Sequence, residues 1–413
     1  MTLSQRQGDR RRQSDVTRFP QRGAGVLREL FSGRAPAWPD LTLAESEELL
    51  AALEYHGAAP LAHEAVCRGG ASGVPPEVID RLHRAHLSTA AENQVWLAER
   101  GAVLDALHGA GVTAALLKGA ALMDTVYSSP GLRPISDIDL LVSPAQQATT
   151  LAALKERGYE RAVTDAGPFE HHVLLHGTGA GGMPVAVEVH RRLFASPPYD
   201  AVLPTDDLLA RAERGEDGAL RLAPADALAH LAGHLVLQHA RGERLVWVAD
   251  VDRLVRRHGR EQDFWSGAIE VARSSMLLRS LGDALVLATL WFATPLPDDV
   301  AAVLDAEPPM PAEAAAYARM RRRAPVGAEG DRLLSDVQGV SGLAAKLRFA
   351  ALHLAPPPRT MREWYGLDRS WQLPVYYGRR ALRGLAHIAR RPFRAGSSGA
   401  LESPELWMID HDA

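Results

Sequence analysis

Two aspartates separated by a single residue, Asp137 and Asp139, constrain this chain more than any other feature. The largely apolar run that contains them, residues 137–142, has the length and composition of a β-strand. Asp137 and Asp139 would then point to one face and Ile138 and Leu140 to the other. Adjacent carboxylates that face a protein interior carry a large desolvation cost. We therefore expect this face to be open to solvent or to bind a cation.

A second segment, residues 185–190, alternates as a strand and supplies a third candidate acid, Glu188. Glu188 would share a face with Ala186 and His190, while valines take the opposite face. If this strand lies beside the aspartate strand, three carboxylates converge. Two Mg²⁺ ions would neutralise them and leave positive charge for a substrate phosphate. An exposed position for Glu188, and a surface position for His190 at the strand end, are the alternatives.

Candidate phosphate contacts flank the aspartate strand. Lys118 and Gly119 follow a short apolar run, residues 112–117, at a turn where a strand gives way to a helix. Backbone N–H groups at such a turn bind anions, and the lysine adds a positive charge. Arg133 is a second candidate, and Ser136 either donates a hydrogen bond to the same ligand or caps the turn. Solvated surface positions for the two basic residues are the alternative interpretation.

The rest of the chain has helical periodicity around this unit. A capping box at Thr42 and Glu45 begins one predicted helix, and residues 264–292 form a continuous periodic segment. We therefore predict an α+β fold, with a small mixed β-sheet flanked by helical domains on both sides. The expected regions are a disordered basic arm (1–25), an N-terminal helical region (26–109), an α/β core (110–200), a C-terminal helical domain (201–395) and a flexible tail (396–413).

Length and composition exclude several classes of protein. A chain of 413 residues suggests two or three domains, and a net charge of -4 gives no reason to expect a nucleic-acid or membrane partner. No apolar run approaches the roughly 18 residues that span a bilayer, and the first residues lack the apolar core of a secretion signal. The single cysteine, Cys67, excludes an intramolecular disulfide and a cysteine-built zinc site. We expect a cytoplasmic protein.

Taken together, these motifs resemble the uncharacterised nucleotidyltransferase family of the DNA polymerase β-like superfamily. The resemblance implies a small mixed sheet with an Asp-x-Asp pair and a third acid, two divalent metals (Mg²⁺ or Mn²⁺) and a nucleoside triphosphate as co-substrate. The wider superfamily opens its site with Gly-Ser, whereas this chain has Lys-Gly-Ala. The segments that carry the resemblance are Lys118-Gly119, Arg133-Pro134, residues 136–142 and residues 187–190, with a looser match at His230, His234 and Asp250.

By this resemblance, the family's metal-binding and catalytic acids correspond to Asp137, Asp139 and Glu188. The implied reaction is attack by an acceptor nucleophile on the α-phosphorus of the triphosphate, with release of pyrophosphate. Asp137 and Asp139 would bind both metals, and Glu188 would bind the nucleophile's metal or act as general base. A small molecule, a peptide or protein, and an RNA end are all possible acceptors.

Two other functions remain open from the sequence. The first is a nucleotide-binding or regulatory protein of the same fold with weak catalysis. The second is a metal phosphohydrolase centred on His230 and His234, which lie four residues apart on a predicted helix one turn beyond Asp226. A basic C-terminal helix with nearby aromatic residues also permits nucleic-acid binding, which we do not favour. Its arginines are Arg379, Arg380, Arg383, Arg390 and Arg391.

Overall fold

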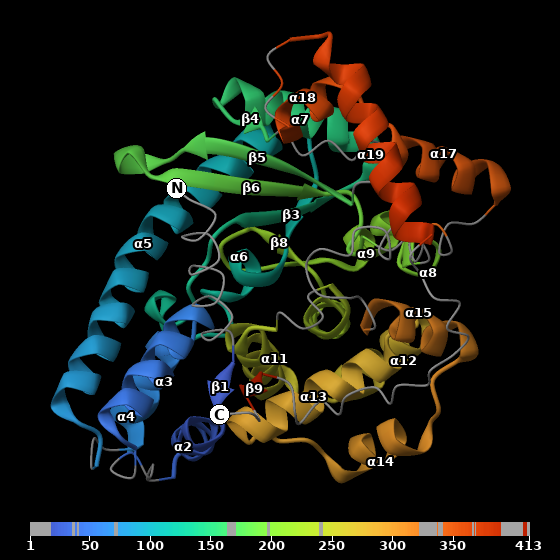
Figure 1. Ribbon diagram of the computed structural model, residues 1–413. Coiled ribbons are helices and arrows are strands. Elements are labelled where there is room, and N and C mark those ends of the chain that lie inside the picture. Colours follow the sequence, from blue (N-terminus) through green and yellow to red (C-terminus); the bar gives the residue numbers. More distant parts are fainter. Residues whose placement is uncertain are drawn as a thin grey trace.

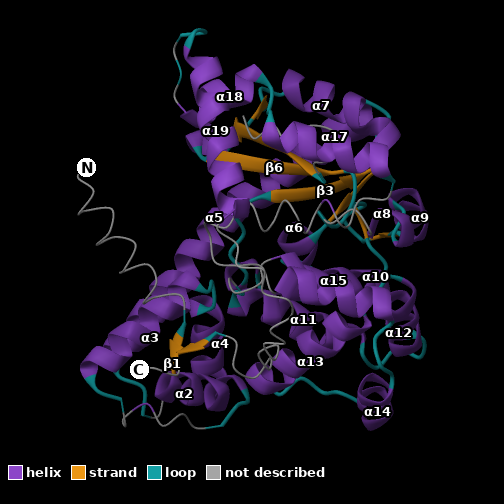
Figure 2. Cartoon of the chain, turned by 45° about the vertical axis from the view of Figure 1, so that its right-hand side comes forward, coloured by secondary structure: helices purple, strands orange, loops and turns teal. Residues whose placement is uncertain are grey.

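The computed structural model of the chain is shown in Figure 1. It describes residues 18–34, 38, 41–69, 73–162, 171–195, 199–238, 243–321, 337, 342–365, 367, 369–389 and 408–410. Within these residues the fold is α+β, as predicted, with helices packed around a seven-stranded mixed sheet. In Figure 2 the sheet lies in the upper half of the molecule, with α7 (Gln147–Glu156) above it and α10 (Pro224–Gly233) and α11 (Leu245–His258) below.

The sheet contains the strands predicted between residues 110 and 200 and two short strands from beyond them. Its order is β4-β5-β6-β3-β2-β8-β7. β3 runs parallel to β6, β2 runs parallel to β8, and the other neighbours are antiparallel. The sheet therefore extends past the predicted core boundary at residue 200. The strands are β2 (Ala114–Leu116), β3 (Ile138–Val142), β4 (Glu160–Arg161), β5 (His172–Thr178), β6 (Pro184–His190), β7 (Glu213–Arg214) and β8 (Leu220–Arg221).

The predicted alternation on β3 and β6 is confirmed, and it separates an apolar face from a charged one. Ile138 and Leu140 lie in a hydrophobic cluster with Val187 and Val189, which covers one face of the sheet. Trp96 and Val103 from the long helix α5 (Pro76–Gly109) and Leu154 from α7 complete that cluster. The opposite face carries the acids. Burial of one face thus fixes the orientation of the other, because strand side chains alternate with a period of two.

The N-terminal helices begin where the sequence signals predict. Thr42 and Glu45 form the capping box of α3, with the Thr42 side chain accepting from the Glu45 N–H and the Glu45 carboxylate accepting from the Thr42 N–H. Pro76 occupies the first position of α5, where a missing N–H costs nothing. This helix runs along the left edge in Figure 1 and links the N-terminal helices to the sheet. The other helices before the sheet are α2 (Gln21–Phe31), α3 (Leu43–Tyr55) and α4 (Ala59–Gly69).

The N-terminal and C-terminal helical regions share one hydrophobic core, because Leu27 and Leu49 belong to the same buried cluster as Leu285 and Trp291.

The continuous segment predicted at 264–292 is divided into two helices, α12 (Phe264–Ser274) and α13 (Leu278–Phe292). Met276 adopts a left-handed conformation (φ 58°) at the break. The remaining helices are α6 (Lys118–Leu122), α8 (Tyr199–Val202), α9 (Thr205–Arg211), α12 (Phe264–Ser274), α13 (Leu278–Phe292), α14 (Asp298–Ala306), α15 (Pro311–Arg321), α17 (Leu343–Leu354), α18 (Pro358–Tyr365) and α19 (Gln372–Ala389); a π-helical turn spans His234–Gln238, and short 3-10 turns span Pro130–Leu132, Pro144–Gln146 and Ala180–Gly182.

Short segments near the two ends of the chain pair with each other. β1 (Phe19–Pro20) runs parallel to β9 (Ile409–Asp410), and Phe19 is fully buried. Part of the predicted arm (1–25) and part of the predicted tail (396–413) therefore contribute to the folded protein, while residues 1–17 lie outside the described residues. Arg379, Arg380 and Arg383 lie on α19, whereas Arg390 and Arg391 lie outside the described residues. No described helix has the length and apolar character needed to cross a bilayer.

Candidate active site

The register of two parallel strands brings Asp139 and Glu188 together. Asp139 on β3 is directly paired with Glu188 on β6, so both side chains leave the same face of the sheet. Asp139 is almost fully buried, whereas the Glu188 side chain is 19% exposed. The conditional prediction that these strands are neighbours is confirmed. A buried acid beside a more open one forms a negatively charged site on this face of the sheet, over two interior strands.

Lys118 supplies a positive charge between these two acids. Its Nζ lies 2.6 Å from Asp139 Oδ1 and 3.7 Å from Glu188 Oε2. The residue stands where β2 ends and α6 begins, with a left-handed backbone (φ 46°) that costs an ordinary residue about 1–2 kcal/mol. Burial opposes protonation of the lysine, but the negative charges of Asp139 and Glu188 raise its pKa. Lys118 is therefore a cation held at the site by the acids.

His190 joins the two acids from the end of β6. Its Nε2 lies 2.8 Å from Asp139 Oδ1 and 3.1 Å from Glu188 Oε2. Burial and the Lys118 charge oppose protonation of the imidazole, yet its hydrogen bonds to the acids raise its pKa. Burial likewise opposes ionisation of the acids, but Lys118 and His190 hold the pKa of Asp139 well below its usual range, and the His190 hydrogen bond lowers that of Glu188. His190 is thus a buried part of the site and not a surface residue.

Asp137 lies at the edge of this cluster, one residue before β3 begins. Burial, reinforced by the negative charge of Asp139, raises the pKa of Asp137 to about 6. Its carboxylate forms no hydrogen bond or ion pair with any described residue. A half-buried carboxylate without a partner is costly, because desolvation is not compensated. Asp137 is therefore the acid of the site that has most to gain from an added cation.

The donor atoms of the site fit a divalent cation. Asp139, Glu188 and His190 each offer a ligand atom within 4.8 Å of the other two, and His171, His172 and His190 form a second such trio. His190 Nδ1 is buried and has no hydrogen-bond partner among the described residues. Carboxylate oxygens suit Mg²⁺, and added imidazole nitrogens favour Mn²⁺ or another transition metal. The structure thus brings Asp139 and Glu188 together with a histidine, with Asp137 outside both trios.

The comparison with protein families agrees with this geometry. The description "uncharacterised nucleotidyltransferase" belongs to the family that matches residues 42–293, which is more than half of the 413-residue chain. The chain belongs to this nucleotidyltransferase family. The match includes both acid-bearing strands and continues through α13. No protein with a curated description matches the chain.

In this nucleotidyltransferase, Arg133 contacts an acid from the C-terminal helical region. Its Nε and Nη2 donate to the two carboxylate oxygens of Asp250 on α11, at 3.2 and 2.7 Å, and the Tyr127 hydroxyl donates to the same carboxylate at 2.7 Å. Arg133 and Asp250 are both buried. This charged network joins the turn before the aspartate strand to α11, so it holds the sheet against the C-terminal helices.

Gly119 makes room for Arg133. A Cβ placed on Gly119 would lie 2.7 Å from the Arg133 guanidinium carbon and 2.8 Å from Ile135 Cγ2. Only glycine therefore allows the arginine to reach Asp250 past this turn. Ser136 is exposed beside Asp137.

The nucleotidyltransferase does not assemble the alternative histidine site. The ring centres of His230 and His234 lie 6.3 Å apart, and neither residue belongs to a trio of closely spaced ligands in the described part of the chain. Asp226 accepts two hydrogen bonds from Arg211, at 3.0 and 2.8 Å. His234 remains one α-helical turn beyond His230, because its N–H donates to the His230 carbonyl, and the π-helical turn begins at His234.

Residues that the sequence prediction did not select contribute to the acid cluster on β3 and β6 and to the hydrogen-bond network around Arg133. His190 and His172 lie on the charged face of the sheet, paired in register on β6 and β5. The same alternation that selected Glu188 would have selected His190, two residues further along the strand. The contacts of Asp250 with Arg133 and Tyr127 have no local signal, because Asp250 lies 117 residues beyond Arg133 and 123 beyond Tyr127.

Proposed function

We propose that this chain transfers a nucleoside monophosphate from a nucleoside triphosphate to an acceptor and releases pyrophosphate. The observation that carries the proposal is the pairing of Asp139 with Glu188 beside Lys118, within a nucleotidyltransferase family. Two carboxylates and a cation on a partly open face of the sheet are suited to bind a phosphate and a divalent metal, and not an apolar ligand.

Asp137, Asp139 and Glu188 are the proposed holders of the divalent cation, Mg²⁺ or Mn²⁺. Bound there, such a cation lowers the pKa of an acceptor hydroxyl and neutralises charge on the triphosphate. His190 orients Asp139 and Glu188, because its Nε2 lies within hydrogen-bonding distance of both. On the opposite side of the sheet, the apolar face of β3 and β6 packs against α5 and fixes the positions of both strands.

Lys118 and Ser136 are the proposed contacts of the triphosphate. Lys118 carries the positive charge nearest to the acids, and Ser136 has an exposed hydroxyl beside Asp137. A lysine neutralises phosphate as a mobile point charge, so it can leave Asp139 when a phosphate enters. Gly119 and Arg133 do not contact the triphosphate in this proposal. Their close packing fixes the turn from which Lys118 projects, and so positions the lysine.

Glu188 is the proposed general base. Its Oε2 is engaged by His190 at 3.1 Å, while Oε1 has only a longer contact of 3.7 Å with His172 Nε2. Oε1 is therefore the oxygen free to accept a proton from the acceptor hydroxyl as that oxygen bonds to the α-phosphorus. The positive charge of Lys118 stabilises the negative charge that develops on the leaving pyrophosphate.

The test uses Asp139→Asn and Glu188→Gln, which preserve side-chain volume and remove one charge each. With a radiolabel on the α-phosphate, we expect label transfer in Mg²⁺ or Mn²⁺ to fall at least about 100-fold in each variant. Asp105→Asn, at an exposed position of α5, is the matched control and should retain full transfer. Variants that bind and transfer the nucleotide like the parent would refute the assignment of these acids.

The same assay separates this function from the regulatory alternative. A parent protein that binds the labelled triphosphate through Asp139 but transfers no label to any fraction of a cell extract would be a nucleotide-binding protein of the same fold. Release of labelled nucleoside monophosphate to water alone would indicate hydrolysis instead of transfer.

A further inference from the structure

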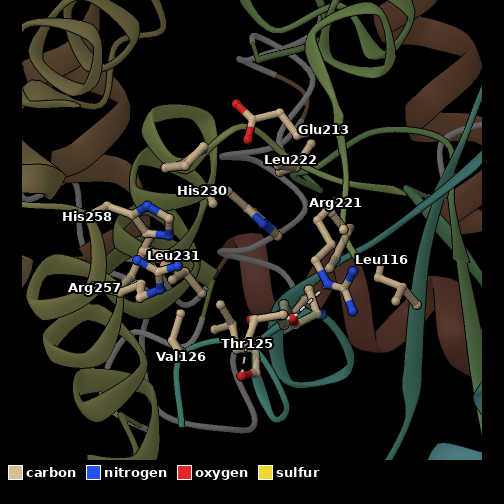
Figure 3. A pocket seen from close by; sticks show the side chains of 18 of the residues that line it. Leu116, Thr125, Val126, Glu213, Arg221, Leu222, His230, Leu231, Arg257 and His258 are labelled. Atoms are coloured by element: carbon tan, nitrogen blue, oxygen red, sulfur yellow. Dashed lines mark hydrogen bonds between the residues drawn. The ribbon is translucent and has the colours of Figure 1, made fainter. Parts of the chain in front are cut away.

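A cavity of about 190 Å³ adjoins the proposed catalytic site (Figure 3). It lies between α6, the β7–β8 hairpin, α10 and α11, and Lys118, which contacts Asp139, is among its lining residues. A single water needs only about 10–15 Å³. The cavity thus holds a small organic group beside Lys118 and leaves no space for a folded macromolecule. Its apolar walls come from Leu122, Val126, Leu222, Leu231 and Leu254.

A buried polar atom faces this cavity without a partner. His230 projects from α10 toward the centre of the cavity in Figure 3, between Arg257 on one side and Arg221 on the other. The His230 side chain is 2% exposed, and its Nε2 forms no hydrogen bond with any described residue. An unpaired buried nitrogen is unfavourable. A ligand with a hydrogen-bonding group at this depth would remove that cost.

The charge around the cavity favours an anion. Of the charged residues that line it, Lys118, Arg214, Arg221 and Arg257 are basic, and only Glu213 is acidic. Lys118 and Arg221 are neutralised by the acids that they contact. Arg257 is exposed on α11 and has no carboxylate partner among the described residues. It is therefore a free guanidinium available to a ligand.

We propose that this cavity binds the acceptor, and that the acceptor is a small molecule with an apolar body, a group that hydrogen-bonds His230 and an acidic group that pairs with Arg257. This inference rests on the proposed nucleotidyl transfer. A nucleobase is uncharged and would leave Arg257 without a partner, whereas an acceptor with its own carboxylate or phosphate uses both features of the cavity. A volume of this size favours a small molecule over an RNA end or a protein surface.

The reaction balances with these components alone. The acceptor hydroxyl oxygen forms a bond to the α-phosphorus, and the bond between the α-phosphorus and the bridging oxygen of the β-phosphate breaks. Pyrophosphate leaves with the electron pair, and the hydroxyl proton passes to Glu188.

The experiment incubates the full chain with Mg²⁺ and α-labelled triphosphates, separately with the low-molecular-mass filtrate, the RNA and the protein of a cell extract. We expect label in the filtrate, in a phosphodiester product that carries at least one further acidic group from the acceptor. Arg257→Gln should require about tenfold more filtrate for half-maximal labelling, since one charge-assisted contact is lost. The concentration of triphosphate needed should not change. Arg260→Gln, an exposed charge outside the cavity, is the control.

His230→Leu fills the buried position with an apolar side chain and removes the nitrogen. It should also raise the amount of filtrate needed and leave the triphosphate requirement unchanged. Arg257→Gln alone decides the question if that variant fails to fold. Label only on RNA or protein, a product with no acidic group besides the phosphodiester, or an Arg257→Gln curve equal to the parent's overturns the inference and leaves the transferase intact. An effect of Arg257→Gln on the triphosphate also overturns it. A parent that binds no Mg²⁺-triphosphate refutes the proposed function, and this inference with it.

Discussion

Lys118 Nζ lies 2.6 Å from Asp139 Oδ1, and this contact makes a lysine the counter-ion of the buried acid. His190 reaches the same oxygen at 2.8 Å. A lysine and a histidine thus contact the acid at the position in which we place a divalent metal. The lysine is the one that can move, because its long side chain is 14% exposed whereas His190 is 1% exposed.

Lys118→Met should make the stability of the protein depend on a divalent metal. The variant leaves Asp139 with His190 alone, so we expect it to lose roughly 2–3 kcal/mol of unfolding free energy without metal. Added Mg²⁺ or Mn²⁺ should restore more stability to the variant than to the parent, because no lysine has to be displaced. Thermal unfolding with and without each metal measures both effects. Equal metal-induced shifts in the two proteins would contradict a shared position for lysine and metal.

Arg133→Met should be strongly destabilising. It removes a bidentate partner and leaves Asp250 charged and buried, which costs about 3–5 kcal/mol. Arg273→Met is the matched control, because Arg273 forms a pair of similar geometry with Glu307, at 2.7 Å for both bonds, on side chains that are 40% and 34% exposed. That control should cost no more than about 1 kcal/mol. Urea denaturation of both variants gives the comparison, and similar losses would show that burial does not set the strength of the Arg133 pair.

Gly119→Ala should destabilise the protein by about 1–3 kcal/mol, since the added methyl group displaces the Arg133 guanidinium or Ile135. Gly101→Ala on α5 is the control. Nothing lies within 4 Å of a Cβ at Gly101, so that substitution should stabilise the helix by about 0.5–1 kcal/mol. In thermal unfolding, Gly119→Ala should lower the midpoint temperature and Gly101→Ala should raise it. Combining Gly119→Ala with Arg133→Met should cost less than the sum of the two, because both changes act on one contact.

Asp217→Asn should reduce stability near neutral pH and have little effect in acid. The Arg221 hydrogen bonds, at 2.7 and 2.6 Å, lower the pKa of Asp217 to about 2, against the opposing effect of partial burial. A lowered pKa means that the ion pair stabilises the fold fully above about pH 4 and loses this contribution as the pH falls toward about 2. The side chain is 36% exposed, so we expect less than about 1 kcal/mol. Urea midpoints of parent and variant should converge on acidification; a constant gap would contradict the ion pair as its source.

Much of the site could be predicted because it depends on local alternation. The faces of β3 and β6 followed from residues two apart, and the capping box of α3 followed from residues three apart. The same reasoning did not find the break between α12 and α13. Met276 carries a left-handed φ of 58° without the glycine that usually marks such a turn.

The sequence by itself determined which side chains point to opposite faces of the sheet. Asp139 points away from the face of Leu140, and Glu188 points away from the face of Val189. These relationships depend on neighbours in the chain, so a single strand is enough to define them. Only the tertiary structure decided that β3 lies beside β6, that Lys118 reaches Asp139, and that Arg133 contacts Asp250. Those choices depend on burial and charge between segments far apart in the chain, for which local periodicity carries no signal.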